Sequence, residues 1–357
     1  MKVNGQPRRA LEAAPEGDAV VVIDQRGLPH RWLLARLDSV AAVRTAIGEM
    51  WVRGAPLIGV TAAYGIALQC RVDAGDAALD EAKRWLDSVR PTAVNLSWAT
   101  RRMLELVRPQ PVERRAEAAW ALAGAMADED VAVNAAIGGH GLVLLQQAAA
   151  RRPGRRLNVL THCNAGWLAT VDWGTALAPV YRAHQVGLDL HVWVDETRPR
   201  NQGASLTAWE LGQEGVPHTV IADNAGGHLM QHGQVDLVIV GADRVTGRGD
   251  VCNKIGTYLK ALAAHDNGVP FYVAVPRSTL DLSLDDGLAE IEIEERSARE
   301  VTHVTGLDGS GQLTEVALMP AGSPAANPAF DVTPARLVTG LITELGVLAA
   351  TPDALRG

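Results

Sequence analysis

The chain has few of the residues that mark secreted, membrane-bound or metal-clustered proteins. Its 357 residues include only three cysteines, Cys70, Cys163 and Cys252, too few and too scattered for a disulfide framework or a zinc cluster. Residues 1–20 lack the apolar core of a signal peptide, and we find no uninterrupted apolar run of membrane-spanning length. We therefore expect a cytoplasmic protein in a reducing compartment, with no membrane partner.

Charge and missing motifs exclude further classes of function. The 33 lysines and arginines against 41 aspartates and glutamates give a formal net charge of -8, which disfavours a nucleic-acid partner. There is no GxGxxG after the first strand of the expected sheet and no phosphate-binding GxxxxGKS/T loop, so neither motif supports a nucleotide cofactor. HExxH and paired CxxC motifs are also missing. We therefore expect chemistry that uses no metal and no cofactor.

The residues that are present describe an ordinary globular protein with two expected domains. Hydrophobic residues make up 47% and charged residues 21% of the chain, which suits a sizeable core. Residues 1–18 are polar and contain prolines and glycines, so we expect them to be poorly ordered. Residues 19–24 and 30–36 are expected to form a strand pair around a turn at 25–27.

A helical apolar pattern then extends from residue 38 to about residue 147. The expected helices are 39–52, 56–70, 77–89, 96–107 and 111–145. We expect the last of these to break near Gly138 and Gly139. Residues 1–148 are thus predicted to form a mostly helical N-terminal domain with a short strand pair at its start.

Beyond residue 154 the pattern alternates between strand, loop and helix. The expected strands are 157–161, 188–194, 218–222, 235–240 and 269–275, with helices such as 205–214 and 255–264 between them. This alternation predicts an α/β domain over residues 149–357 with a doubly wound parallel sheet. We also expect a short strand around Ile291 and Ile293 and a last helix from Thr333 to about Leu345.

The first expected strand of the sheet ends in a reactive residue type, Cys163. A parallel strand that stops there at a tight turn into a helix would place the thiol near a helix N-terminus, which favours a thiolate. The alternative is a small apolar cysteine that fills a gap at the strand end. His162 should point to the opposite face of the strand, which suits a core or supporting role better than that of a base.

Other strands end in polar residues as well, and the carboxyl ends of parallel strands meet at one edge of a sheet. Asp243 follows the apolar run 235–242, and desolvation there would raise its pKa and suit it to acid–base work. Arg244 or Lys254 would lower the same pKa. The alternative is that Asp243 only caps a turn. Asp195 and Glu196 are expected to bond neighbouring loops or Arg198.

Two joints in the helical half carry an arginine. Residues 53–56 end one helix and begin the next, with Gly54 free to adopt a positive φ and Pro56 suited to the first turn. Backbone N–H groups beside Arg53 would make a seat for a phosphate. The alternative is an ordinary helix stop with a solvated arginine. Arg90 lies at the second joint, before a helix capped by Asn95.

Taken together, several segments resemble the methylthioribose-1-phosphate isomerase family, whose superfamily includes the alpha, beta and delta subunits of the translation initiation exchange factor. They are residues 52–65 (VRGAPLIGVTAAYG), 90–96 (RPTAVNL), 161–166 (THCNAG), 194–211 (VDETRPRNQGASLTAWEL), 241–258 (with GADRV and NKIGTY) and 327–334 (NPAFDVTP). The resemblance covers about residues 20–347. It implies a helical N-terminal domain, a Rossmann-like C-terminal domain and a homodimer. The first strand usual in that family is not visible in residues 1–18.

The resemblance also implies a reaction and its residues. The family's catalytic cysteine falls on Cys163 and its catalytic aspartate on Asp243. Its substrate-binding positions fall on Arg53, Gly54, Ala55, Arg90, Gln202, Asn253 and Lys254. The implied activity is an aldose–ketose isomerisation in methionine salvage, from 5-methylthioribose 1-phosphate to 5-methylthioribulose 1-phosphate. Asp243 would act as general acid and base, and Cys163 as a thiolate base or a stabiliser of the transition state.

Other functions stay open beside this one. The same isomerisation could act on 5-deoxyribose 1-phosphate, or on ribose 1,5-bisphosphate, although a second phosphate needs more cations than we find at the strand ends. A non-catalytic regulatory subunit, similar to those of the translation factor, is a further alternative. The presence of both Cys163 and Asp243 argues against that alternative.

Overall fold

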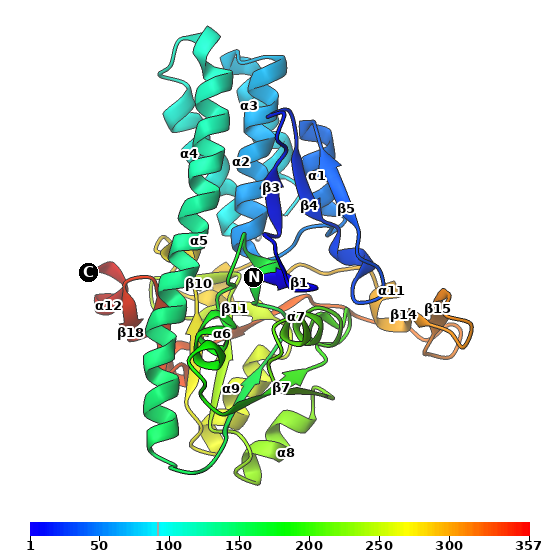
Figure 1. Ribbon diagram of the computed structural model, residues 1–357, viewed down its shortest axis with the longest axis vertical. Helices are drawn as coiled ribbons and strands as arrows, with labels where there is room; N and C mark the ends of the chain where they lie inside the picture. The colour runs from blue at the N-terminus through cyan, green and yellow to red at the C-terminus, as the bar shows by residue number, and fades with distance from the viewer. Residues whose placement is uncertain (91–92) are drawn as a thin grey trace.

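A computed structural model describes residues 1–90 and 93–357 (Figure 1). Pro91 and Thr92, in the expected joint after Arg90, lie outside the described residues. Long helices form one layer of the molecule, and an α/β layer lies below it in the view of Figure 1. The predicted fold class, a helical part followed by a doubly wound α/β part, is confirmed.

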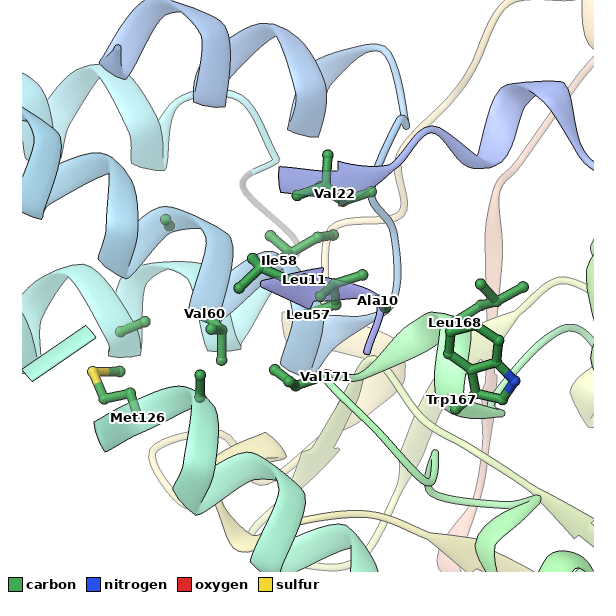
Figure 2. Packing of buried hydrophobic residues seen from close by; sticks show 14 of the residues in the cluster. Ala10, Leu11, Val22, Leu57, Ile58, Val60, Met126, Trp167, Leu168 and Val171 are labelled. Carbon is green, nitrogen blue, oxygen red and sulfur yellow. The ribbon is translucent and has the colours of Figure 1, made fainter. Parts of the chain in front are cut away.

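The start of the chain is ordered, so the prediction for residues 1–18 is wrong. Strands β1 (Lys2–Val3) and β2 (Gln6–Pro7) pair with each other, and β3 (Leu11–Ala13) joins β4 (Val20–Ile23) and β5 (Leu34–Leu37) in an antiparallel sheet. The expected strand pair is thus two strands of a three-stranded sheet. Leu11 is buried close to Leu57 in the core shown in Figure 2. Pairing with β4, together with the hydrogen bond from the backbone N–H of Ala10 to the backbone oxygen of Val171, orders a segment whose own composition is polar.

The helical layer contains α1 (Val40–Gly48), α2 (Ala55–Val72), α3 (Asp76–Asp87), α4 (Val94–Val107) and α5 (Val112–Ala150). All five correspond to expected helices. By length and composition alone helix α2 could cross a membrane, but 83% of it is buried inside the protein. It packs against α1, α3, α4 and α5, so it is the central helix of this layer.

Helix α5 is continuous over 39 residues, so the expected break at Gly138 and Gly139 is wrong. These glycines lie where α5 passes α6 (Ala178–Gln185). A Cβ on Gly141 would lie 2.2 Å from Cγ of Pro179, and one on Gly138 would lie 3.1 Å from Cβ of Ala178. Glycine therefore allows the two helices to approach each other, and the helix continues through it.

The α/β layer is built on a seven-stranded sheet with the order β18-β17-β12-β9-β6-β7-β8. Its strands are β6 (Leu157–Thr161), β7 (Leu190–Asp195), β8 (His218–Ile221), β9 (Leu237–Val240), β12 (Phe271–Ala274), β17 (Gly340–Thr343) and β18 (Gly346–Leu348). All neighbours are parallel except β17 and β18. The five strands expected from the sequence are present. Starting from β6, the parallel strands have the spatial order 3-2-1-4-5-6 of a doubly wound sheet.

Helices α6, α7 (Ala208–Gln213), α8 (Ala225–Gln231) and α9 (Thr257–Asp266) connect these strands. The expected helix 205–214 begins as a π-helical turn, Gly203–Thr207, before α7. A second sheet, which we did not expect, has the order β13-β10-β11-β16. Its strands are β10 (Arg244–Thr246), β11 (Val251–Lys254), β13 (Leu280–Asp281) and β16 (Phe330–Thr333).

The C-terminal part differs most from expectation. The predicted last helix, 333–345, is wrong, because these residues form a short 3-10 turn (Ala335–Leu337) and then β17 and its turn into β18. Residues 340–343 (GLIT) are all buried, and β17 pairs with β12, a partner distant in sequence. The short strand expected near Ile291 and Ile293 is wrong too: Ile291 instead packs in a small apolar cluster with Phe330.

Short elements complete the chain. A hairpin of β14 (His303–Leu307) and β15 (Leu313–Ala317) projects from the body on the right of Figure 1. The remaining helices are α10 (Gly287–Glu290), α11 (Arg299–Thr302) and α12 (Pro352–Arg356). The domain division at residue 148 stays a prediction. Helix α5 packs on α2 and α4 as well as on α6, β6 and β17, and one apolar cluster extends from Leu11 to Ile342.

Candidate active site

The site lies where the order of the sheet reverses. Strand β6 has β7 on one side and β9 on the other, and ligands of doubly wound sheets bind in the crevice beyond the carboxyl ends of two such strands. Cys163 follows β6, and Asp243 follows β9. Their positions at this switch point follow from the order of the strands alone.

All nine predicted site residues line one cavity that is open to solvent. They are Arg53, Gly54, Ala55, Arg90, Cys163, Gln202, Asp243, Asn253 and Lys254. The sequence analysis missed the apolar wall, which includes Met50 and Phe330. Phe330 belongs to the quoted segment NPAFDVTP, so its motif was the available signal, whereas nothing in the sequence marked Met50.

Gly54 and Arg53 form the joint at the start of α2. Gly54 has φ of +89°, and a Cβ there would lie 2.4 Å from the carbonyl oxygen of Ala169, so the position requires glycine. The N-terminal backbone of α2 borders the cavity at Gly54 and Ala55, as expected for an anion seat. Arg53 is not solvated: its Nη1 and Nη2 each donate to the backbone oxygen of Asn164 at 3.1 Å, and Nη2 also donates to Asn164 Oδ1.

Cys163 lies at the strand end, but its expected helix is different. The chain beyond it is irregular up to a 3-10 turn at Trp167–Ala169, and α6 begins only at Ala178. The expectation of a helix directly after this strand is therefore wrong; the N-terminus of α2 borders the cavity instead, as does Gln202 before the π-helical turn Gly203–Thr207. Cys163 has φ of +65°, an unusual conformation that is held by Thr197 and Thr207.

Burial and nearby positive charges shift the pKa values of the Cys163 thiol and the Asp243 carboxyl in opposite directions. Burial raises the pKa of the Cys163 thiol, and the charges of Arg53 and Lys254 lower it. Burial likewise raises the pKa of the Asp243 carboxyl, while Lys254, Arg90 and Arg53 lower it. Both opposing influences expected for Asp243 are thus present, and Lys254 contributes to both sites.

The other polar residues come from several elements. Lys254, on β11, donates from Nζ to the backbone oxygen of Ala329 at 2.9 Å and lies over the ring of Phe330, and burial lowers its pKa. Nδ2 of Asn253 donates to Thr257 Oγ1 at 3.0 Å. Arg90 is buried with Nε 3.6 Å from Glu294, and burial lowers its pKa.

Some of these polar atoms are buried without a partner in the described part of the chain. They are Nε of Arg53, Nη1 of Arg90 and Oε1 of Gln202. Buried polar groups in proteins almost always form hydrogen bonds, so a cluster of unpaired ones at a cavity indicates a polar ligand. Two cationic donors among them favour an anion.

His162 has a supporting position, as expected. Its ring is buried, with Nδ1 2.9 Å from Oδ2 of Asp195 and Nε2 2.8 Å from the backbone oxygen of Ile255. Asp195 was expected to bond neighbouring loops or Arg198. Its partner His162 lies in the loop after β6, whereas the backbone N–H of Arg198 donates to Asp223. By spacing, His162, Asp195 and Asp223 could hold a metal. Nζ of Lys260 already lies 3.4 Å from Oδ2 of Asp195 and donates to the backbone oxygen of Asp223, so a cation occupies this cluster.

Comparison with known proteins agrees with this geometry. Residues 51–350 match the model of the initiation factor 2 subunit family. The methylthioribose-1-phosphate isomerase of Methylocella silvestris is 61% identical over 356 residues, which cover 99% of this chain and 97% of the relative. That of Rhodospirillum rubrum is 62% identical over 362 residues, covering 100% of this chain and 93% of the relative.

Two solved structures extend the comparison. The 5-methylthioribose 1-phosphate isomerase from Pyrococcus horikoshii has a TM-score of 0.83 at 40% identity, covering 98% of this chain and 95% of that one. The A. fulgidus protein described as translation initiation factor eIF-2B, subunit delta, has a TM-score of 0.79 at 39% identity, covering 98% and 100%. This chain therefore belongs to the initiation factor 2 subunit family, within the group that contains the methylthioribose-1-phosphate isomerases.

Proposed function

We propose that the chain is an aldose–ketose isomerase of methionine salvage that converts 5-methylthioribose 1-phosphate to 5-methylthioribulose 1-phosphate. Relatives of this name match it over almost its whole length at about 60% identity. The observation that carries the proposal is the cavity itself, where a thiol and a carboxyl lie among cationic and amide groups, and where single polar atoms of Arg53, Arg90 and Gln202 lack a partner among the described residues.

The substrate sets two chemical demands. Its anomeric phosphate locks the sugar as a ring, so an acid must protonate the ring oxygen before the ring opens. Hydrogen must then move from C2 to C1, either as a proton through a cis-enediol or as a hydride. A catalyst for this reaction needs an acid, a second group near C2 and a firm hold on the phosphate.

Asp243 is suited to be the acid. Burial raises its pKa, which favours a protonated carboxyl at the start of the reaction. Once it has given its proton to the ring oxygen, its carboxylate is stabilised by Lys254 and Arg90. The same carboxylate can then return a proton when the ketose forms.

Cys163 is suited to act at C2. The charges of Arg53 and Lys254 favour its thiolate, which takes the C2 proton or stabilises the charge that develops in the transition state. Arg53 and the backbone at Gly54 and Ala55 would seat the phosphate, and Arg90, Gln202, Asn253 and Lys254 would bind phosphate and hydroxyl oxygens.

Proton NMR of the protein with 5-methylthioribose 1-phosphate in D₂O tests the activity. We expect the ketose to appear, and deuterium at C1 would identify the enediol route. Ketose without deuterium at C1 would be consistent with hydride transfer, or with a proton that does not exchange with solvent. If neither this sugar nor 5-deoxyribose 1-phosphate yields a ketose, the isomerase proposal fails.

Variants test the two catalytic residues. We expect Cys163→Ser and Asp243→Asn each to lower kcat about a hundredfold or more, with little change in substrate binding. Cys70→Ala is the control for the thiol, because Cys70 lies toward the far end of α2 and does not line the cavity. Asp189→Asn, at an ion pair with Arg156 on the surface, is the control for the carboxyl. Near wild-type turnover of either catalytic variant would refute the role given to that residue.

The alternatives differ in what they require of the cavity. The apolar side chains of Met50 and Phe330 suit a methylthio or a methyl group, so 5-deoxyribose 1-phosphate stays a second candidate substrate. Ribose 1,5-bisphosphate would need further cations beside Arg53, Arg90 and Lys254. Because the chain is also similar to the A. fulgidus protein, a regulatory subunit is a further candidate function. A stable complex with other subunits, without turnover of the sugar phosphate, would favour that function.

The homodimer and the cytoplasmic location are also part of this proposal, and both rest on the sequence. Light scattering of the purified protein measures the first. Fractionation of the cells that make it measures the second.

A further inference from the structure

A carboxyl group without an assigned role lies behind the cavity wall. Glu210, on α7, is 0% exposed and does not line the cavity. It accepts a hydrogen bond from Nδ2 of Asn164 and a longer one, at 3.4 Å, from the backbone N–H of Leu168. Because a buried carboxyl is unfavourable unless it is well bonded, its contacts define what it does.

Asn164 connects this carboxyl to Arg53. Its Nδ2 has two acceptors, Glu210 and Oγ1 of Thr207 at 3.0 Å. Its Oδ1 is thereby turned toward the guanidinium of Arg53, which donates to it and to the backbone oxygen of the same residue. If the amide were flipped, its oxygen would face the carboxylate and its NH₂ group would face the guanidinium, and neither contact could be a hydrogen bond. Glu210 therefore determines the orientation of the amide.

The loop around Asn164 is fitted to this carboxyl. A Cβ on Gly166 would lie 2.0 Å from Oε1 of Glu210, so the segment THCNAG needs glycine at that position. Burial raises the pKa of Glu210 to about 7, whereas the amide of Asn164, the backbone N–H of Leu168 and the charge of Arg53 lower it. Two of these neighbours, Asn164 and Arg53, line the cavity.

We propose that Glu210 is a positioning residue: it fixes the amide of Asn164, and Asn164 holds the guanidinium of Arg53 in place beside the thiol and the phosphate seat. This role rests on the proposed function only in that the seat is taken to bind the phosphate of the sugar. Glu210 itself touches no substrate. It acts by keeping one donor group of the cavity in a single orientation.

Glu210→Gln tests the proposal, because its amide would place an NH₂ group against the N–H donor of either Asn164 or Leu168. Glu214→Gln is the matched control, since Glu214 follows the same helix and bonds the backbone N–H of Lys2 away from the cavity. We expect E210Q to raise KM for the sugar phosphate about tenfold or more with a smaller change in kcat, the range for loss of one charge-assisted hydrogen bond.

Two measurements do not depend on turnover. The first is the rate at which iodoacetamide alkylates Cys163, which should fall in E210Q because Arg53 is less well placed to favour the thiolate. The second is the concentration of inorganic phosphate that protects Cys163 by half, which should rise about tenfold in E210Q and not in E214Q. If the isomerase activity is absent but these two changes occur, the positioning role stands and the proposed function fails.

A double-mutant cycle separates positioning from a general loss of structure. If Glu210 acts through Asn164, E210Q should have little further effect in an Asn164→Ala background. Equal effects of E210Q in both backgrounds, or an E210Q protein with unchanged KM, alkylation and protection, would overturn the proposal. If E210Q does not fold, the N164A variant alone tests the proposal. Protection of Cys163 by phosphate that is unchanged in N164A would overturn the proposal.

Discussion

The two glycines Gly139 and Gly141 of α5 should respond differently to replacement by alanine. Gly139 is exposed, and a Cβ there would meet no atom within 4 Å. Gly141 is buried, and its Cβ would lie 2.2 Å and 2.7 Å from Cγ and Cβ of Pro179. Comparing the two replacements therefore distinguishes the gain in helix propensity, which both share, from the packing cost between α5 and α6, which only Gly141 has.

The expected magnitudes follow from these two contributions. Replacing glycine with alanine inside a helix stabilises it by about 1 kcal/mol, and this applies to both positions. At Gly141 the extra methyl group also overpacks the contact with Pro179, which costs about 1–3 kcal/mol. We expect G139A to raise the free energy of unfolding by about 1 kcal/mol, and G141A to lie about 1–3 kcal/mol below G139A.

Urea unfolding followed by far-UV circular dichroism measures both variants against the wild type. If α5 were broken near Gly138 and Gly139, as the sequence pattern suggested, G139A would destabilise the protein by forcing a helix through the break. Equal stabilisation by both alanines would show that the close approach of α5 and α6 at Pro179 is not present.

Two further predictions concern ionisable groups. Lys254→Met removes a charge that lowers the pKa of Cys163, so alkylation of Cys163 at pH 8 should slow about tenfold or more. Cys70 is the internal control in mass mapping, because burial raises the pKa of its thiol to about 11 and Lys254 does not act on it. An unchanged rate would refute the electrostatic coupling. Burial raises the pKa of Asp130 to about 7, so the folded state binds more protons than the unfolded state and loses stability as pH rises from about 4 to 7. Asp130→Asn should therefore raise the urea midpoint at pH 8 and leave it unchanged at pH 4; the same change at both would contradict this.

The sequence predicts well wherever local pattern and tertiary structure agree. Residues 157–160 form a largely apolar run that is followed by polar residues, and β6 has the predicted bounds. Cys163 and Asp243 could be placed together because parallel strands share one edge. The seven binding positions came from the resemblance, and the structure brings them to the same cavity, although their roles stay predictions.

The failures share a physical cause: each depends on a partner that is far away in the sequence. Pro334 and the apolar residues after it have a helical pattern, yet the edge of β12 draws residues 340–343 into the sheet. Leu11 lies in a polar segment but packs in the core near Leu57. Glu210 in the segment TAWEL resembles a solvated residue on a helix face, and only the fold shows that it is buried against Asn164.

The length of α5 has a consequence for how the molecule unfolds. At 1.5 Å per residue its 39 residues form a rod of about 58 Å that runs along both layers (Figure 1). The apolar cluster that it helps to enclose contains α2 residues such as Leu57 and residues beyond β6 such as Trp167 and Val171 (Figure 2). Loss of either layer would expose this shared cluster to water, so we expect the two layers to melt together as one cooperative unit.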